Sequence, residues 1–263
     1  MTLYQELVLS NFIRKATFLT FFTRGARVIE NKHFVAIDSG FPSDTFNVLV
    51  PLSPLPAAME TTVKETIDSF ANKGFPLSIW VDRRFLTNDT VTWLDDAGMN
   101  EAERNITMKL DHDYIKYNAP LSAGVLDIKE VKDQKDVFLY GEVFQSLFEG
   151  TPEQAVLQLF FKNVAANYQP SQKKMRWFVG FFRGQAVSTG CVIEADNSYG
   201  IYDVMTRKEF RGRGFGSVMF DFLLSQIKTE KNGKPCVLQA SQDGLNIYKR
   251  AGFEEVGEMI VWQ

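Results

Sequence analysis

Apolar and polar positions in the second half of the chain alternate with two different periods. An apolar series at i, i+3, i+4, i+7, i+8 and i+12 defines one face of a long helix, made of Phe215, Val218, Met219, Phe222, Leu223 and Ile227. Short apolar runs typical of strands precede and follow it, at 177–182, 186–193, 199–205, 236–240 and 256–262. Further helices are predicted at 133–148, 151–167 and 242–251. This half therefore predicts an α/β domain with a mixed sheet.

The first half shows the same two periods less clearly. Val63, Ile67, Phe70 and Ala71 predict a helix that Gly74 ends, and the run at 77–81 predicts a buried strand after it. Weaker signals predict an N-terminal helix from Leu3 to Ala16, strands at 33–37 and 46–50, and a short helix capped within 88–90 that ends at Gly98. Turn-forming residues cluster near 117–123, so we expect two domains, 1–120 and 121–263.

Composition narrows the class of protein. The chain has 29 basic and 32 acidic residues, a net charge of −3, which gives no electrostatic reason to expect nucleic acid or an anionic membrane as a partner. Two cysteines and two histidines without clustered spacing argue against a disulfide framework and against a bound metal. Because we find neither a signal peptide nor a long apolar run, we expect a cytoplasmic protein. The 23 phenylalanines suggest an aromatic-rich core.

The segment Arg211-Gly212-Arg213-Gly214-Phe215-Gly216 lies between a predicted strand and the long helix. Its glycines permit a tight turn with unobstructed amides, and the helix N-terminus adds free N–H donors and a positive dipole end. Together these features predict a cradle for a phosphate or pyrophosphate, in a locally basic stretch that also holds Arg207 and Lys208. The alternative is a glycine-rich turn with solvated arginines.

Two other phosphate-binding motifs do not fit this segment. A dinucleotide fingerprint counted from Gly212 would need glycine where Ser217 stands, and the following strand ends without an acidic residue. A Walker A loop would need Gly-Lys-Ser/Thr, which is missing.

Roughly residues 125–263 resemble the GCN5-related N-acetyltransferase (GNAT) superfamily in the order of their elements and motifs. A strand is followed by R-x-x-G-x-G, a helix, a second strand and then the sequence NIYKRAGF at 246–253. The resemblance implies that the backbone of 211–216 holds the pyrophosphate of acetyl-CoA. It also implies that the preceding strand splays from its neighbour and pairs with the pantetheine arm. The matching main-chain positions are Asp203, Val204 and Met205, with Thr206 and Ser241 as further contacts.

Tyr248 is the catalytic residue that the resemblance implies, as the group that protonates or stabilises the leaving CoA thiolate. A phenol is a neutral donor able to do this. The alternative is that the ring merely packs beside Leu245 and Ala251. No general base is evident. Asp203 is better placed than Glu194 or Asp196, for which turn or solvated roles are expected. Cys191 is a conceivable acyl carrier, but its apolar setting favours an inert thiol.

The first half is similar to a degenerate copy of the same domain. In the first half, a predicted strand at 77–81 is followed by WLDDAGM at 93–99. This order is similar to that of the strand at 236–240 and the segment 248–253 in the second half, and the alignment places Leu94 at the position of Tyr248. The cofactor motif is absent, and Pro54 and Pro56 remove two backbone donors. Chance similarity is the alternative. We expect the aromatics of this half (Trp80, Trp93, Phe75) to be core residues.

The sequence thus predicts an acetyl-CoA-dependent N-acetyltransferase that acts on an amine of a small molecule or peptide. The alternatives are a non-catalytic acyl-CoA-binding or sensing protein, or a transferase that uses a longer acyl donor. The acceptor and the oligomeric state stay open, although the net charge weakly favours a cationic acceptor.

Overall fold

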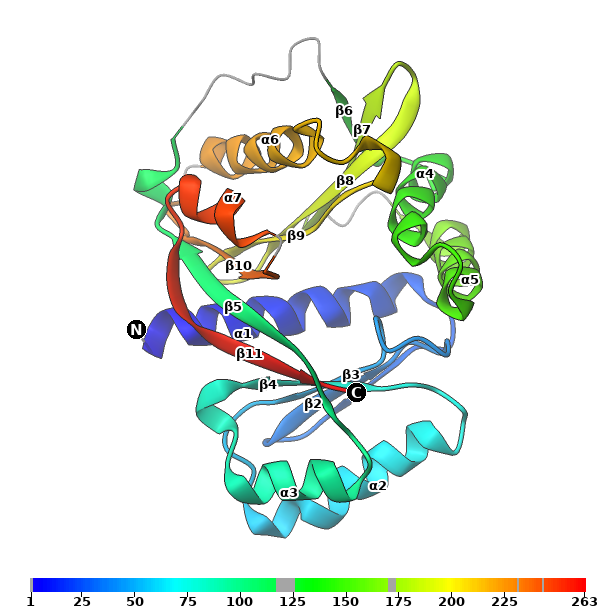
Figure 1. Ribbon diagram of the computed structural model, residues 1–263, viewed down its shortest axis with the longest axis vertical. Helices are drawn as coiled ribbons and strands as arrows, with labels where there is room; N and C mark the ends of the chain where they lie inside the picture. Colours follow the sequence, from blue (N-terminus) through cyan, green and yellow to red (C-terminus); the bar gives the residue numbers. More distant parts are fainter. Residues whose placement is uncertain (1, 117–125, 170–173, 231, 243) are drawn as a thin grey trace.

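A computed structural model describes residues 2–116, 126–169, 174–230, 232–242 and 244–263, and its strands form one mixed sheet of eleven (Figure 1). The strand order is β1-β2-β3-β4-β11-β5-β10-β9-β8-β7-β6. The strands are β1 (Arg27–Glu30), β2 (Phe34–Asp38), β3 (Val48–Pro51), β4 (Ser78–Asp82), β5 (Glu101–Leu110), β6 (Asp127–Glu130), β7 (Met175–Phe182), β8 (Gln185–Glu194), β9 (Tyr199–Thr206), β10 (Cys236–Ala240) and β11 (Glu254–Trp262).

Helices cover both faces of this sheet. They are α1 (Thr2–Phe18), α2 (Glu60–Ala71), α3 (Asn88–Asp96), α4 (Gln134–Gln145), α5 (Pro152–Asn167), α6 (Phe215–Thr229) and α7 (Leu245–Arg250), with short 3-10 turns between several of them. In Figure 1, α6 and α7 lie over the C-terminal half of the sheet and α2 and α3 over the N-terminal half, while α1 crosses the middle of the molecule. Within the described residues, no helix has the length and apolar character that a membrane crossing requires.

The two halves of the chain, 2–116 and 126–263, follow the same path. In each half, one antiparallel pair (β2 with β3, β8 with β9) leads to a helix and then to a strand parallel to the last one (β4 beside β3, β10 beside β9). A second helix and a final strand follow. The predicted internal repeat of elements is therefore present, and the mixed α/β fold class is confirmed.

Each half gives its final strand to the other. β11 pairs antiparallel with β4 of the first half, and β5 pairs antiparallel with β10 of the second. The exchanged strands β5 and β11 then pair with each other at the centre of the sheet. This exchange makes the sheet continuous across the halves, with a local two-fold relationship between β5 and β11.

The end of the second helix is built identically in the two halves. The amide of Met99 donates to the carbonyl of Leu94 at 2.9 Å, and the amide of Phe253 donates to that of Tyr248 at 3.1 Å. Gly98 and Gly252 precede these residues, and both have the positive φ that such a helix end requires. Leu94 therefore occupies the position that corresponds to Tyr248, as the alignment of the two halves predicts.

Several predicted boundaries were wrong. The predicted helix 242–251 begins only at Leu245, because the carbonyl of Ser241 accepts the amides of Gly244 and Leu245 in a turn. The cap of α3 is Thr87, whose side chain accepts from the amide of Thr90, and not a residue within 88–90. The predicted domain boundary at 117–123 lies outside the described residues.

Phenylalanines fill the largest hydrophobic cluster, as the composition suggests. Phe46 stacks on Phe160 with ring centroids 3.8 Å apart, and Phe144 and Phe161 continue the cluster between α4, α5 and the sheet. Trp93 is also a core residue. Trp80 packs against the core as expected, although it is only half-buried and also lines the cavity described below.

Candidate active site

The segment 211–216 forms an open turn before α6. Gly212 and Gly214 have φ values of 74° and 82°, which favour glycine, and a Cβ added at either would meet no atom within 4 Å. Gly214 is the N-cap of α6, and its carbonyl accepts the amide of Val218. Among the described residues, the amides from Gly212 to Ser217 donate no backbone hydrogen bond. Six adjacent N–H groups are therefore available to an anion.

Aromatic rings hold one arginine of this turn in place. The guanidinium of Arg213 lies 4.5 Å from the ring centroid of Phe182, 5.1 Å from that of Phe215 and 5.5 Å from that of Phe210. Arg207 is bound to other partners: its guanidinium donates to the carbonyl of Ala186 and pairs with Glu142. The positive charge at the turn itself thus comes from Arg213 and the exposed Arg211.

Strands β9 and β10 separate beside this turn. They pair only through Cys236 with Tyr199 and Val237 with Gly200, after which the register ends. Further along β9, the carbonyls of Asp203 and Met205 accept the hydroxyls of Thr189 and Ser188, on the β8 side. Because main-chain groups alternate in direction along a strand, those of the intervening Val204 turn toward the gap. Of the three predicted strand positions, Val204 is the best placed to bind a ligand there.

Asp203 occupies a bulge in β9. The register between β8 and β9 shifts here, and Asp203 has a φ of 55°, which is uncommon for a residue with a side chain. Its carboxylate accepts the hydroxyl of Tyr140 at 3.0 Å and pairs with Lys15 of α1 at 3.2 Å. These contacts tie the bulge to helices from both halves of the chain.

Tyr248 packs its ring into the core below α6. Its centroid lies 4.9 Å from that of Phe220, and burial raises the pKa of its phenol above the usual 10.0. A Cβ at Gly244 would lie 3.2 Å from the hydroxyl, so the hydroxyl is beside the turn that follows β10. Within the described residues, this hydroxyl makes no hydrogen bond. The ring of Tyr248 therefore packs in the core, while its hydroxyl can still donate a hydrogen bond.

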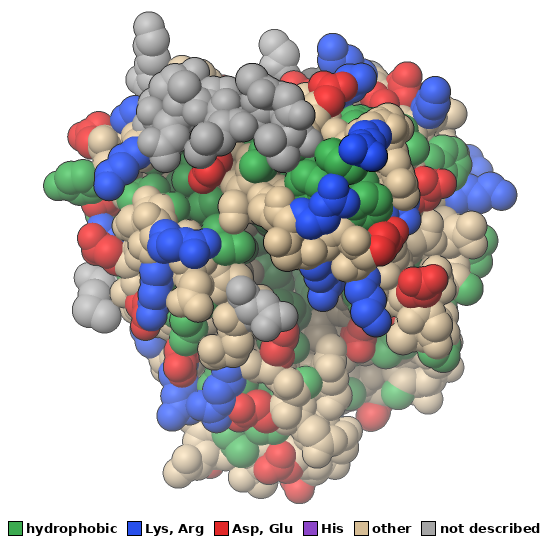
Figure 2. Space-filling model, turned by 45° about the horizontal axis from the view of Figure 1, so that its top comes forward, with side chains coloured by type: hydrophobic (Ala, Val, Ile, Leu, Met, Phe, Trp, Pro, Cys, Tyr) green, Lys and Arg blue, Asp and Glu red, His purple; other side chains and the backbone are tan. Residues whose placement is uncertain are grey.

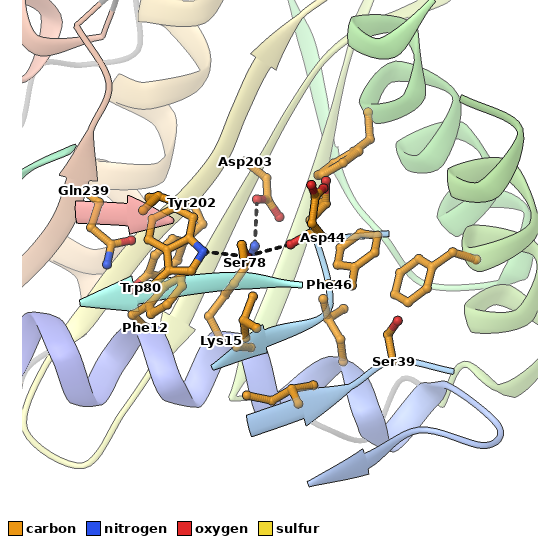
Figure 3. Close-up of a pocket in the computed structure, with 18 of the residues that line it drawn as sticks. Phe12, Lys15, Ser39, Asp44, Phe46, Ser78, Trp80, Tyr202, Asp203 and Gln239 are labelled. Atoms are coloured by element: carbon orange, nitrogen blue, oxygen red, sulfur yellow. Dashed lines mark hydrogen bonds and ion pairs between the residues drawn. The ribbon is translucent and has the colours of Figure 1, made fainter. Parts of the chain in front are cut away.

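A cavity of about 300 Å³ lies between the two halves, where β9 and β10 separate. Figure 3 shows Asp203, Lys15 and Ser78 in the middle of its wall, with Tyr202, Trp80 and Phe12 to one side and Asp44 and Phe46 to the other. Phe144, Phe148 and Phe160 of the α4–α5 region complete an aromatic wall. Figure 2 shows a hollow between the two halves with basic side chains beside it. The cavity joins Asp203 and Met205 of the second half to β3 and β4 of the first.

The other candidates lie away from this site or are occupied. Glu194 pairs with Lys234 at 2.6 Å at the far end of β8, and Asp196 is exposed in the following turn. Cys191 is fully buried, and burial raises the pKa of its thiol well above 9.0; both features argue against a role as acyl carrier. Ser241 is exposed directly after β10. No cluster of metal-ligating side chains occurs in the described residues.

The equivalent place in the first half lacks the cradle. β3 and β4 also pair over only two positions, so the strands part as β9 and β10 do. The chain then continues through Pro51, Pro54 and Pro56, which carry no N–H, and Leu55 is buried. The first turn of α2 holds Glu60, whose charge opposes an anion. The first half therefore keeps the splayed strands without the donors.

Lys15, Tyr140 and the aromatic wall were not identified from the sequence. Lys15 and Tyr140 lie on helices distant in sequence from Asp203, and their amphipathic patterns contain no sign of that contact. The phenylalanines of the wall were predicted only as core residues, because phenylalanines in a core and phenylalanines in a cavity wall give the same apolar pattern in the sequence. The one available signal was the excess of phenylalanine itself.

Comparisons with known proteins agree with this arrangement. Residues 149–261 match the family described as acetyltransferase (GNAT) domain. Over nearly the whole chain, the fold is similar to that of a GCN5-related N-acetyltransferase from Kribbella flavida, with a TM-score of 0.68, 16% identity and coverage of 97% of this chain and 95% of that one. A functionally unknown conserved protein from Staphylococcus epidermidis is similar at a TM-score of 0.65, with 12% identity and coverage of 95% and 98%.

A tandem GNAT protein from the clavulanic acid biosynthesis pathway also has this fold, with a TM-score of 0.56, 10% identity and coverage of 91% of this chain and 83% of that one. No curated protein matches the sequence. At these identities, the structural likeness establishes the fold.

Proposed function

We propose that the chain transfers an acetyl group from acetyl-CoA to an amine, because residues 149–261 match the acetyltransferase (GNAT) domain family and the fold is similar to that of a tandem GNAT protein. The observation that carries the proposal is the row of uncommitted amides from Gly212 to Ser217, next to splayed strands that open on a cavity. The amides and the positive end of the α6 dipole match the charge of a pyrophosphate. The open space above Gly212 and Gly214 leaves room for one.

Acetyl-CoA fits the remaining features of the site. The main-chain groups of Val204, which the alternation along β9 turns toward the gap, suit a peptide-like arm between β9 and β10. The gap leads toward Asp203, Met205 and Gln239 at the cavity wall. Bound acetyl-CoA would supply a thioester as the acyl donor. The chain aligns the acceptor amine with the thioester, and such alignment lowers the activation barrier by several kcal/mol in well-oriented systems. It also donates a proton from Tyr248 to the leaving thiolate.

The two halves have different roles in this proposal. The C-terminal half provides the cradle, the splayed strand and Tyr248. The N-terminal half has prolines in place of the cradle, and contributes α1, β3 and β4 to the cavity. It therefore serves as one wall of the acceptor site.

A calorimetric titration with acetyl-CoA tests the proposal. We expect micromolar binding by the wild-type protein and loss of at least 100-fold in affinity in Gly214→Asp, which adds a side chain and a negative charge at the cradle. Gly74→Asp is the matched control, because Gly74 also has a positive φ of 67° and open space but follows α2 in the other half. Absence of binding by folded wild-type protein would refute acetyl-CoA as the donor, and unchanged affinity in folded Gly214→Asp would refute the cradle.

A turnover assay separates the enzyme from the sensor. If acetyl-CoA binds and no amine accepts the acetyl group, the protein is an acyl-CoA-binding protein. If longer acyl-CoA donors react faster than acetyl-CoA, the donor assignment changes and the site stays the same.

A further inference from the structure

The cavity between the halves has the chemistry of a particular kind of acceptor. From its walls we infer that the acceptor is a primary amine attached to a compact apolar body the size of one aromatic ring. The inference rests on the proposed function and names the substrate class of the same site.

The first support is the apolar lining. The rings of Phe12, Phe46, Trp80, Phe144, Phe148 and Phe160 line the cavity. Aromatic walls gain free energy by covering an apolar ligand, and their faces also attract an ammonium group. At about 300 Å³, the cavity lies at the small end of ligand pockets. The body of the ligand must therefore be both apolar and small.

The second support is that several polar side chains of the wall are already bonded to the protein. The hydroxyl of Ser78 donates to the carbonyl of Asp44 and accepts the indole N–H of Trp80. The hydroxyls of Ser39 and Tyr202 donate to Asn47 and Asn11. The wall therefore has few free groups for a ligand with many hydroxyls or amides. Burying such a ligand unpaired would cost free energy.

The third support is the charge of the lining residues. Among the described residues, the charged side chains of the lining are one cation, Lys15, and three carboxylates, Asp44, Glu103 and Asp203. Lys15 and Asp203 pair with each other at 3.2 Å, and Glu103 accepts only the neutral amide of Asn105, so Asp44 and Glu103 keep negative charge that attracts an ammonium group. Burial and the nearby Glu153 raise the pKa of the Asp44 carboxyl, so a cation beside it would relieve an unfavourable charge. An anionic acceptor is disfavoured on the same ground.

The charge and the apolar wall together exclude other amine classes. A polyamine would offer the aromatic wall only thin alkyl segments, which bury less apolar surface there than a ring does. An amino sugar would leave its hydroxyls without partners. A single amine on a ring-sized apolar body satisfies both features.

Rate measurements with three probes test the inference at saturating acetyl-CoA. We expect kcat/KM for 2-phenylethylamine to exceed the values for spermidine and glucosamine by at least tenfold. Equal or higher values for spermidine or glucosamine would overturn it.

Direct binding separates this inference from the proposed function. We expect 2-phenylethylamine to bind the wild-type protein in a calorimetric titration, with and without CoA present, and the uncharged 2-phenylethanol to bind at least tenfold more weakly. Binding of the amine by a protein that ignores acetyl-CoA would refute the proposed reaction and leave the inferred ligand class standing. Binding of acetyl-CoA without binding of the amine would refute the inferred class alone.

Two variants locate the binding site. Glu103→Gln changes an exposed residue, and we expect it to raise KM for 2-phenylethylamine several-fold with unchanged affinity for acetyl-CoA. Phe148→Ala opens the aromatic wall, and we expect a rise in KM of at least tenfold. Phe138→Ala is its control, because Phe138 is an exposed phenylalanine on α4 that does not line the cavity. Unchanged KM in both Glu103→Gln and Phe148→Ala would place the acceptor elsewhere.

Discussion

At the scale of single residues, Tyr248 combines a structural and a chemical role. Its ring packs on Phe220, and its hydroxyl makes no hydrogen bond within the described part of the chain. Removing that hydroxyl should therefore leave the packing intact. The corresponding Leu94 in the first half keeps the packing and the helix end without a donor.

We expect Tyr248→Phe to lower kcat about 100-fold, the lower range for loss of an acid catalyst, with little change in acetyl-CoA affinity or in thermal stability. Initial rates and a calorimetric titration on the same preparation measure this. Tyr114→Phe is the control, since Tyr114 is an exposed tyrosine. An equal loss of affinity and rate would indicate a packing role.

The pH dependence of the rate follows from burial of the same phenol. Because burial raises the pKa of Tyr248 above 10.0, the phenol keeps its proton throughout the neutral and mildly alkaline range. We expect that kcat of the wild type does not fall between pH 8 and about pH 9. A decline of kcat within that range, absent in Tyr248→Phe, would contradict the raised pKa.

The ion pair between Lys15 and Asp203 should matter for stability. Both side chains are nearly buried, at 13% and 11% exposure, so removal of one partner leaves an uncompensated charge. We expect Lys15→Met to lower the free energy of unfolding by about 3 kcal/mol in urea denaturation. Lys129→Met, which breaks an exposed pair with Asp127, should change it by less than about 1 kcal/mol.

A double variant distinguishes the charge effect from lost packing. Asp203→Asn suits the left-handed backbone at this position, which asparagine tolerates. We expect Lys15→Met with Asp203→Asn to be more stable than Lys15→Met alone, because the unpaired charge is gone. A further loss of stability in the double variant would contradict this explanation.

At the scale of elements, the sequence predicted what depends on local pattern. Strand β10 has the predicted bounds, and α6 begins at Phe215, because a clear period and glycine or proline stops mark both. Strand β5 was missed, since its first four residues, Glu101 to Arg104, are all exposed, three of them are charged, and they show no strand period. The length of α7 was overestimated because the turn at Ser241 depends on backbone hydrogen bonds.

The site divides in the same way. The glycine-rich turn and Tyr248 lie in one continuous segment, so their motif is visible in the sequence. The cavity requires α1, β3, β4 and α5 to meet β9, and that meeting depends on the exchange of β5 and β11. Residues such as Lys15 and Phe160 gain their place in the site only from this tertiary arrangement.

At the scale of the whole molecule, the exchanged strands make the halves interdependent. Without β5, β10 would lose its antiparallel partner, and without β11, β4 would lose its own. The cavity, in which the proposed acceptor binds, would also lose one of its walls. The chain should therefore fold as one unit.

We expect residues 1–116 and 126–263, expressed separately, to be unfolded or aggregated, and to copurify as a folded complex when expressed together. Circular dichroism and size-exclusion chromatography measure this, and the intact chain should show one cooperative thermal transition. Independent folding of either fragment, with no affinity for the other, would contradict the interdependence of the halves.

The most direct test of the central claim is hydrogen–deuterium exchange with and without acetyl-CoA, at short labelling times and low pH. The amides from Gly212 to Ser217 have no backbone partner within the described residues, so a bound pyrophosphate should slow their exchange markedly. We expect this protection together with protection at Val204, and no change at the start of α2 in the first half. Protection at the start of α2, or none at 212–217 when acetyl-CoA is bound, would contradict the assignment of the donor site to the C-terminal half.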